Sequence, residues 1–144
     1  MRIVAALAAA ALLASATAQA QPPPLPEVRL SAGMHLIRAE VADTFGSRMQ
    51  GLMHRRSLPP NGGMLFVYEQ TDLHCMWMKN TLIPLSVAFL DERGTIINLA
   101  DMQPLSEQSH CAARPASYAL EMSQGWFDER GIGPGSRLRG LPAK

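Results

Sequence analysis

The segment Met76–Pro84, which reads MWMKNTLIP, holds an aromatic ring, an ammonium group and an amide within four residues. Alternate side chains of a strand share a face, so Trp77 and Lys79 point the same way and Asn80 points to the other side. An indole beside an ammonium group can stack on a sugar or an apolar ring while Lys79 binds a carboxylate or phosphate. In the alternative interpretation, Trp77 fills the core and the Lys79 stem passes along it to water.

Two further charged residues fall on apolar elements. Arg48 lies roughly 60° from Phe45 on a predicted helix, at the margin of its apolar stripe. A guanidinium group in that position needs a carboxylate or several carbonyl groups, because burial of an unpaired charge is costly. Glu121, the one acid in the apolar strand Tyr118–Met122, is the best candidate partner. The alternative is a structural ion pair that joins the helix to the sheet.

A cluster of Arg48, Lys79 and Glu121 leaves two classes of function open. The first is a periplasmic binding module, with Trp77 and Asn80 at the site, for a small anionic or sugar-like ligand or a cell-envelope partner. The second is an enzyme, with Glu121 as general acid or base and the two cations stabilising negative charge. The lack of a second acid, a nucleophile elbow or a phosphate loop favours binding. A raised pKa at Glu121 inside a concave pocket would favour the enzyme.

The start of the chain has the pattern of an export signal. Arg2 gives it a positive charge, Ile3–Ala14 is an apolar run, and Ala18–Ala20 has the Ala-x-Ala form of a cleavage site. The apolar run is shorter than the roughly 20 residues that span a bilayer. We therefore predict cleavage after residue 20 and an exported protein, periplasmic or secreted, with no membrane anchor in its mature form.

The two cysteines, Cys75 and Cys111, are predicted to form a disulfide, because unpaired thiols seldom persist in an oxidising compartment. The alternative is metal handling, since His74 and His110 each precede a cysteine and complete a two-His, two-Cys set. Adjacent residues of a regular strand point to opposite faces, so a strand would not aim both members of a pair at one ion. We predict no metal site and no cofactor.

Charge and length limit the remaining possibilities. Without Arg2, the 13 Lys and Arg residues fall to 12, which equals the 12 Asp and Glu residues. This balance gives no field that would attract nucleic acid or an anionic membrane. Residues 21–27, which contain the proline tract Pro22–Pro26, are predicted to be an extended spacer. Residues 28–144 have the length of one domain.

Short extended runs dominate that domain, separated by turn-forming residues. Asp43 is predicted to cap a helix whose apolar side chains form one stripe against a core, and Ser123 to cap a short helix that stops at Gly131. The fold class expected is α+β: a compact, mainly antiparallel, curved or barrel-like sheet with about two short helices. The stripe consists of Phe45, Met49, Leu52 and Met53. The predicted strands are Val28–Leu30, Met34–Val41, Met64–Tyr68, Cys75–Lys79, Leu85–Leu90, Thr95–Ala100, Ser117–Met122 and Ser136–Leu141.

The chain contains an ordered set of short motifs, which are Arg48-x-x-Gly51-Leu52-Met53, Gly63-Met64-Leu65-Phe66, Trp77-Met78-Lys79-Asn80-Thr81, Ile83-Pro84-Leu85 and Leu120-Glu121. With this set the chain resembles, from about Ala39 to Leu138, the domain-of-unknown-function 192 (DUF192) family. This resemblance implies a small, compact, β-rich domain, often exported, whose biochemical role is not established. Family patterns commonly carry an aspartate after Ile-Pro-Leu, where this chain has Ser86, so a catalytic role for that aspartate does not transfer.

Overall fold

The computed structural model describes residues 23–144. The predicted signal peptide, residues 1–20, and the first two residues of the predicted spacer lie outside this range. The end of the spacer already contacts the domain, because the carbonyl of Pro26 accepts a hydrogen bond of 2.7 Å from the backbone N–H of Val41, and Leu25 packs against the core. Within the described residues, no helix has both the length and the apolar character to cross a membrane.

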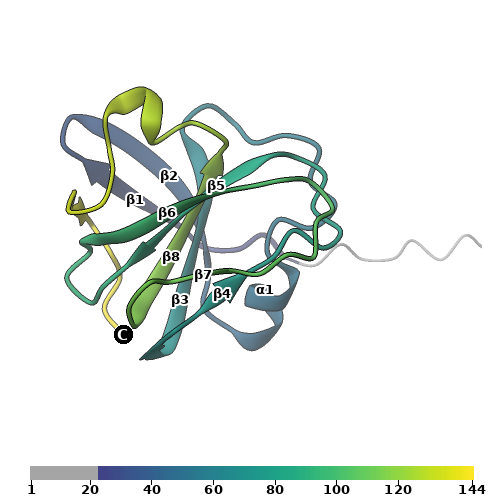
Figure 1. The fold of residues 1–144 in the computed structure, drawn as a ribbon, viewed down its shortest axis with the longest axis horizontal. Helices are drawn as coiled ribbons and strands as arrows, with labels where there is room; N and C mark the ends of the chain where they lie inside the picture. The colour runs from purple at the N-terminus through teal and green to yellow at the C-terminus, as the bar shows by residue number, and fades with distance from the viewer. Residues whose placement is uncertain (1–22) are drawn as a thin grey trace, which may run out of the picture.

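The central feature is a curled seven-stranded sheet that resembles half of a barrel (Figure 1). Its neighbouring strands are antiparallel except for one parallel pair, β2 with β3, so the sheet is mixed. Two short strands, β4 (Cys75–Met76) and β7 (His110–Cys111), pair separately and lie on the same side as the helix α1 (Phe45–Gln50). The order in the large sheet is β6 (Ile96–Met102), β5 (Leu85–Leu90), β8 (Ala116–Ser123), β3 (Gly62–Asp72), β2 (His35–Ala42), β1 (Glu27–Ala32) and β9 (Leu138–Arg139).

The predicted α+β class overstates the helical part, and the expectation of two short helices is wrong. The described residues contain one six-residue α-helix, α1 (Phe45–Gln50), and one 3-10 turn, Asp128–Arg130. The chain is therefore mostly β. The second predicted helix, from Ser123, is reduced to that 3-10 turn, although Gly131 does stop it in the left-handed conformation, with a φ of 64°.

The helix α1 begins one residue later than predicted and does not pack as predicted. Thr44, not Asp43, is the N-cap, and its hydroxyl and the Ser47 side chain form a reciprocal capping box. Gly51 ends the helix with a φ of 48°, a conformation that glycine adopts without strain. No residue within α1 is buried, so the apolar stripe reaches the core only at Leu52, after the helix has ended.

Local strand signals were more reliable. The first hairpin forms with Glu27 opposite Glu40, and β5 has the predicted bounds. The segment predicted as a strand over Cys75–Lys79 keeps only two residues of pairing, because after Met76 the chain turns. Met78 is nevertheless fully buried and anchors this turn to the sheet.

Apolar side chains cover both faces of the sheet, in two separate clusters. The cluster inside the curl includes Leu65 and Leu120, whereas the cluster on the other face includes Met64 and Val87. Glu121 lies directly opposite both Met64 and Val87 in the sheet, and residues directly across share a face. The only charged residue buried in the described chain thus lies on the face that α1 and β4 cover.

Candidate functional site

A cavity of about 470 Å³ lies between α1, β3 and the segment around β4. Its walls combine apolar and polar side chains, and its apolar members Phe45, Met49 and Trp77 are partly exposed at the surface. The polar or charged side chains that line it include Arg48, Tyr68, Glu69, Asp72, His74 and Glu121. The lining residues come from three separate stretches of the chain, residues 45–53, 66–81 and 121, so the fold creates this site.

Glu121 is the most deeply buried charged group of this cavity. Only 3% of its surface is exposed. Burial raises the pKa of its carboxyl from 4.5 to about 8, because removal from water disfavours the charged form. Within residues 23–144 no hydrogen bond or ion pair involves this carboxyl, and no enclosed polar side-chain atom lacks a partner. The remaining accessible surface of the carboxyl therefore opens into the cavity that it lines.

Gly63 allows β3 to approach Glu121. A Cβ atom at this position would collide with the backbone carbonyl oxygen of Glu121 and with the Sδ atom of Met122. A larger residue would push β3 away from β8 at the point where the two strands hold the carboxylate. The glycine is therefore part of the framework that places Glu121.

Tyr68 forms the neighbouring wall. Its hydroxyl donates to the Sδ atom of Met76 at 3.2 Å, and its ring is stacked on the imidazole of His74. Burial raises the pKa of the Tyr68 hydroxyl, the charge of Glu121 raises it further, and the charge of Arg48 opposes both effects. Tyr68 therefore remains a neutral hydrogen-bonding group beside the carboxyl of Glu121.

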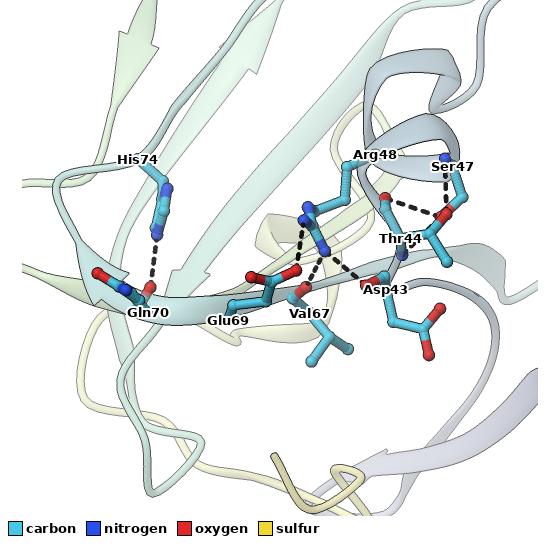
Figure 2. Close-up of polar contacts among 8 residues, drawn as sticks. All are labelled: Asp43, Thr44, Ser47, Arg48, Val67, Glu69, Gln70 and His74. Carbon is cyan, nitrogen blue, oxygen red and sulfur yellow. Dashed lines mark hydrogen bonds and ion pairs between the residues drawn. The ribbon is translucent and has the colours of Figure 1, made fainter.

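Arg48 does not pair with Glu121, and that prediction is wrong. Figure 2 shows its guanidinium group between the helix start and β3. The Nη1 atom donates to the carbonyl oxygens of Asp43 at 2.6 Å and Val67 at 3.0 Å, and Nη2 lies 3.5 Å from a carboxylate oxygen of Glu69. Backbone carbonyls satisfy the partly buried cation instead of a buried acid, and the guanidinium group ties α1 to β3.

Of the three predicted site residues Trp77, Lys79 and Asn80, only Trp77 lines the cavity. Trp77 is 41% exposed and lines the cavity, so it does not fill the core. The Nζ atom of Lys79 lies 5.2 Å from the Trp77 ring centroid, but Lys79 and Asn80 are not among the lining residues. Asn80 has a φ of 54°, and its carbonyl accepts from the N–H of His54. The cavity thus contains three of the predicted site residues, Arg48, Trp77 and Glu121.

The predicted disulfide between Cys75 and Cys111 is present and joins β4 to β7. It removes both thiolates from the two-His, two-Cys set that a metal site would have used. His74 instead places its Nε2 atom 2.8 Å from the carbonyl oxygen of Gln70, as Figure 2 shows. His110, which pairs with Met76 in the register of β4 and β7, does not line the cavity.

Sequence reasoning missed Tyr68 as a site residue, although a signal was present. Met64, Phe66 and Tyr68 alternate along β3, and such residues share one face of a strand. Because Met64 lies opposite Glu121, extending this alternation places Tyr68 on the face of the carboxyl. The contribution of Glu69 had no comparable signal, since the predicted strand ended at Tyr68 and β3 continues to Asp72.

Ser86, which follows Ile-Pro-Leu, lies outside the cavity. Its hydroxyl donates to a carboxylate oxygen of Asp101 at 2.6 Å and accepts from the N–H of Gly125 at 3.0 Å. The side chain is buried, and both contacts connect strand ends and a turn. The serine therefore has a structural role at this position.

The chain matches one family model and is similar to solved structures. The family model DUF192, described as "Uncharacterized ACR", matches residues 28–140. A proposed transcription regulator from Sinorhizobium meliloti 1021 is 36% identical, with 84% of this chain and 98% of that chain covered and a TM-score of 0.78. A protein of unknown function from Novosphingobium aromaticivorans DSM 12444 is 32% identical, covers 80% of this chain and 86% of its own, and gives a TM-score of 0.77. No curated protein matches the chain.

Proposed function

Because the chain belongs to the DUF192 family, a family described as uncharacterised, we propose its function from its own cavity: it is a binding module for a small molecule held above Glu121. The observation that carries this proposal is the carboxyl of Glu121, a residue that is 3% exposed, which opens into a cavity of about 470 Å³ and has no partner among residues 23–144. Small-molecule sites typically have volumes of about 300 to 1,000 Å³ and combine apolar walls with a few polar groups. The cavity has both properties.

The walls favour a ligand with an apolar or ring-shaped body. Trp77 and Phe45 present exposed aromatic surface at the mouth of the cavity, and Phe66 supplies a buried aromatic wall. Rings of this kind can stack on a sugar-like or aromatic ligand. The polar end of such a ligand would then reach the carboxyl of Glu121.

An anionic ligand, one of the classes expected from the sequence, fits this cavity less well. Lys79 does not line the cavity, and the guanidinium of Arg48 is occupied by carbonyl oxygens and by Glu69. An anion would also approach the acids of the lining. We therefore propose a neutral or cationic ligand, or a cell-envelope partner that inserts a neutral or cationic group into the cavity.

Export belongs to the same proposal. The pattern of Arg2, Ile3–Ala14 and Ala18–Ala20 supports cleavage and transfer out of the cytoplasm. The disulfide Cys75–Cys111 agrees with an oxidising compartment, where such bonds persist. N-terminal sequencing of the protein recovered from the periplasm should begin at Gln21, and a chain recovered only from the cytoplasm with residues 1–20 intact would contradict export.

A thermal-shift screen tests the binding proposal. The purified protein is heated with neutral sugars, organic cations and organic anions, because a ligand that binds only the folded state raises the midpoint by mass action. A true ligand of the cavity should lose this effect in Trp77→Ala and keep it in Arg139→Ala, an exposed residue on β9 far along the sheet. Equal shifts in both variants would place binding elsewhere, and no shift with any compound class would contradict the proposal.

One observation favours a second function, acid-base catalysis. The carboxyl of Glu121 has a pKa of about 8 and lies in a concave cavity, and both features are typical of catalytic acids. A protonated Glu121 can donate a proton at neutral pH while neutral Tyr68 orients the substrate. Neither predicted charge stabiliser fits this role well, since Arg48 is already paired and Lys79 lies outside.

A panel of chromogenic esters and glycosides distinguishes this second function from simple binding. Hydrolysis that falls as pH rises through about 8 and disappears in Glu121→Gln would support it, because the acid form would be the active one. Hydrolysis that persists in Glu121→Gln would contradict a catalytic role for this residue.

A further inference from the structure

The charged side chains that line the cavity are mostly acids. Glu69, Asp72 and Glu121 all contribute to its walls, whereas Arg48 is the only Lys or Arg among the lining residues described. When Glu121 is ionised, the lining carries two more negative than positive charges, and when it is protonated the excess is one. The field inside the cavity therefore favours a cation.

Arg48 has little capacity left to hold an anion. Its Nη1 atom donates to two carbonyl oxygens and its Nη2 atom faces a carboxylate oxygen of Glu69. Only 16% of the Arg48 side chain is exposed. The guanidinium group thus serves as a bridge between α1 and β3, whereas no hydrogen bond or ion pair within residues 23–144 involves the carboxyl of Glu121.

Aromatic rings surround the same space. Phe45, Phe66, Tyr68 and Trp77 all line the cavity. The faces of such rings carry negative partial charge and attract ammonium groups, and aromatic sites use this attraction to hold organic cations. Aromatic walls and an unpartnered buried carboxyl together form a site for a cation with an apolar body.

We infer that the cavity binds a small organic amine, with its ammonium group on the carboxylate of Glu121 and its apolar body against Trp77 and Phe45. This inference rests on the proposed binding function and names its ligand class. Tyr68 and Phe66 also line the space that the amine enters. Its N–H groups donate to both carboxylate oxygens, for which the described part of the chain provides no donor.

Binding of the amine is coupled to loss of a proton from Glu121. Burial keeps the carboxyl protonated at neutral pH, with a pKa of about 8, so an arriving ammonium ion displaces one proton to solvent. The pair that remains is a carboxylate and an ammonium ion. The other titratable or charged groups that face Glu121 across the cavity are Arg48 from α1, Tyr68, Glu69 and Asp72 from β3, and His74 before β4. The residue paired with Glu121 on β5 is Val87, which does not titrate.

Three probes with the same phenylethyl body and a different polar end test the inference: 2-phenylethylamine, 2-phenylethanol and 3-phenylpropanoate. Isothermal titration of the purified protein should show the amine binding at least tenfold more tightly than the alcohol or the anion. At pH 6.5, titrations in buffers of different ionisation enthalpy should show release of close to one proton. The affinity should rise about tenfold per pH unit up to pH 7 and level off above a pH of about 8.

Glu121→Gln provides the matched variant, because it keeps the shape of the protonated side chain and cannot ionise. It should lose at least tenfold in amine affinity and all of the pH dependence. Trp77→Ala, a change at the exposed rim, should weaken amine and alcohol alike and so tests the apolar wall independently. Asp128→Asn removes an exposed acid outside the cavity and should bind as the wild type does.

The outcomes separate the ligand class from the binding function. Equal affinity for the alcohol or the anion, no binding of the amine, or amine binding without proton release would overturn the amine inference. The cavity would still be a binding site after any of these results if another class of compound raised the midpoint of the wild type in the thermal-shift screen but not that of Trp77→Ala. Failure of every class in that screen would overturn the proposed function and the amine inference together.

Discussion

Tyr68 and His74 lie face to face, with their ring centroids 3.6 Å apart and their planes inclined by only 8°. Tyr68 belongs to β3 and His74 immediately precedes β4, so this stack connects the large sheet to the small one. The hydroxyl of Tyr68 also donates to Met76 within β4. The ring stack and this hydrogen bond therefore hold one wall of the cavity in place. The disulfide of Cys75, the residue after His74, ties the same wall to β7.

The disulfide should account for much of the stability of this wall. Cys75 and Cys111 are 36 residues apart, and closing a loop of that length stabilises a protein by about 3 to 4 kcal/mol in the chain-entropy model. Reduction should therefore lower the free energy of unfolding by up to this amount, measured by urea denaturation with and without dithiothreitol.

The double variant Cys75→Ala/Cys111→Ala is the control for this prediction. It should unfold at the urea concentration of the reduced wild type and should not respond to dithiothreitol. Thiol titration of the freshly purified wild type should detect no reactive thiol until the protein is reduced. Two reactive thiols without reductant would contradict the disulfide itself.

Arg48 should contribute to stability mainly through backbone carbonyls and less through its ion pair. Its Nη1 atom serves two carbonyl oxygens, while its acidic partner Glu69 has a side chain that is 81% exposed. Arg48→Ala should lower the free energy of unfolding by about 3 kcal/mol, because two carbonyls lose a charged donor. Glu69→Gln should lower it by less than about 1 kcal/mol, because exposed ion pairs are weak.

Denaturation of both variants in urea, at low and high salt, distinguishes the two contributions. Arg48→Lys should recover only part of the loss, since one ammonium group cannot reproduce the fixed geometry of the guanidinium donors. If Glu69→Gln cost as much as Arg48→Ala, the ion pair would be the main contribution and the role of the carbonyls would be contradicted.

The part of the fold that could be predicted is the part that depends on neighbours in sequence. The first hairpin and β5 follow from alternation and turn residues within a few positions. The parallel pairing of β2 with β3 could not be predicted in the same way, because its register is fixed only after α1 and the loop that follows have packed. The sheet is mainly antiparallel, as expected, and this one parallel pair is what makes it mixed.

The helix α1 shows why an apolar stripe does not identify a core. Phe45 and Met49 have the spacing of buried helical residues, yet they are 76% and 53% exposed and border the cavity. Spacing reports which residues share a face, and it does not report whether a wall or an opening lies opposite. A pocket lined by apolar residues and a core therefore have the same sequence pattern.

The position of Glu121 in the candidate site could be predicted because the sequence contains a conflict there, a charged residue among apolar ones. An acid inside the apolar strand β8 is such a conflict, and Glu121 is indeed buried. The partners of Arg48 were not predictable, because they are carbonyl oxygens of Asp43 and Val67, and every residue has a carbonyl. Only the path of the backbone determines which carbonyls a guanidinium group meets.

Trp77 and Met78 are adjacent but should differ sharply when truncated. Met78 is fully buried in the apolar cluster beneath α1 and β4, so Met78→Ala should lower the free energy of unfolding by about 2 to 5 kcal/mol. Trp77 is 41% exposed at the cavity mouth, so Trp77→Ala should cost less than about 2 kcal/mol. Chemical denaturation of both variants checks this difference, and equal losses would mean that Trp77 serves the core.

The buried carboxyl of Glu121 should make the protein less stable as the pH rises. The pKa of Glu121 is about 8 in the folded chain and 4.5 without burial, so between these values the folded state binds more protons than the unfolded state. The free energy of unfolding then falls with increasing pH, by up to about 5 kcal/mol at about 1.4 kcal/mol per pKa unit. The contribution is fully present below pH 4.5 and is lost above a pH of about 8.

Urea denaturation of the wild type and of Glu121→Gln, at intervals from pH 4.5 to pH 9, measures this linkage. Because glutamine does not ionise, Glu121→Gln should lack this component of the slope and should be the more stable protein at pH 9. The difference between the two curves isolates Glu121, since all other carboxyls titrate in both proteins. A difference that stays constant over this range would mean that the carboxyl titrates as an exposed one does, and that the cavity admits enough water to solvate its charge.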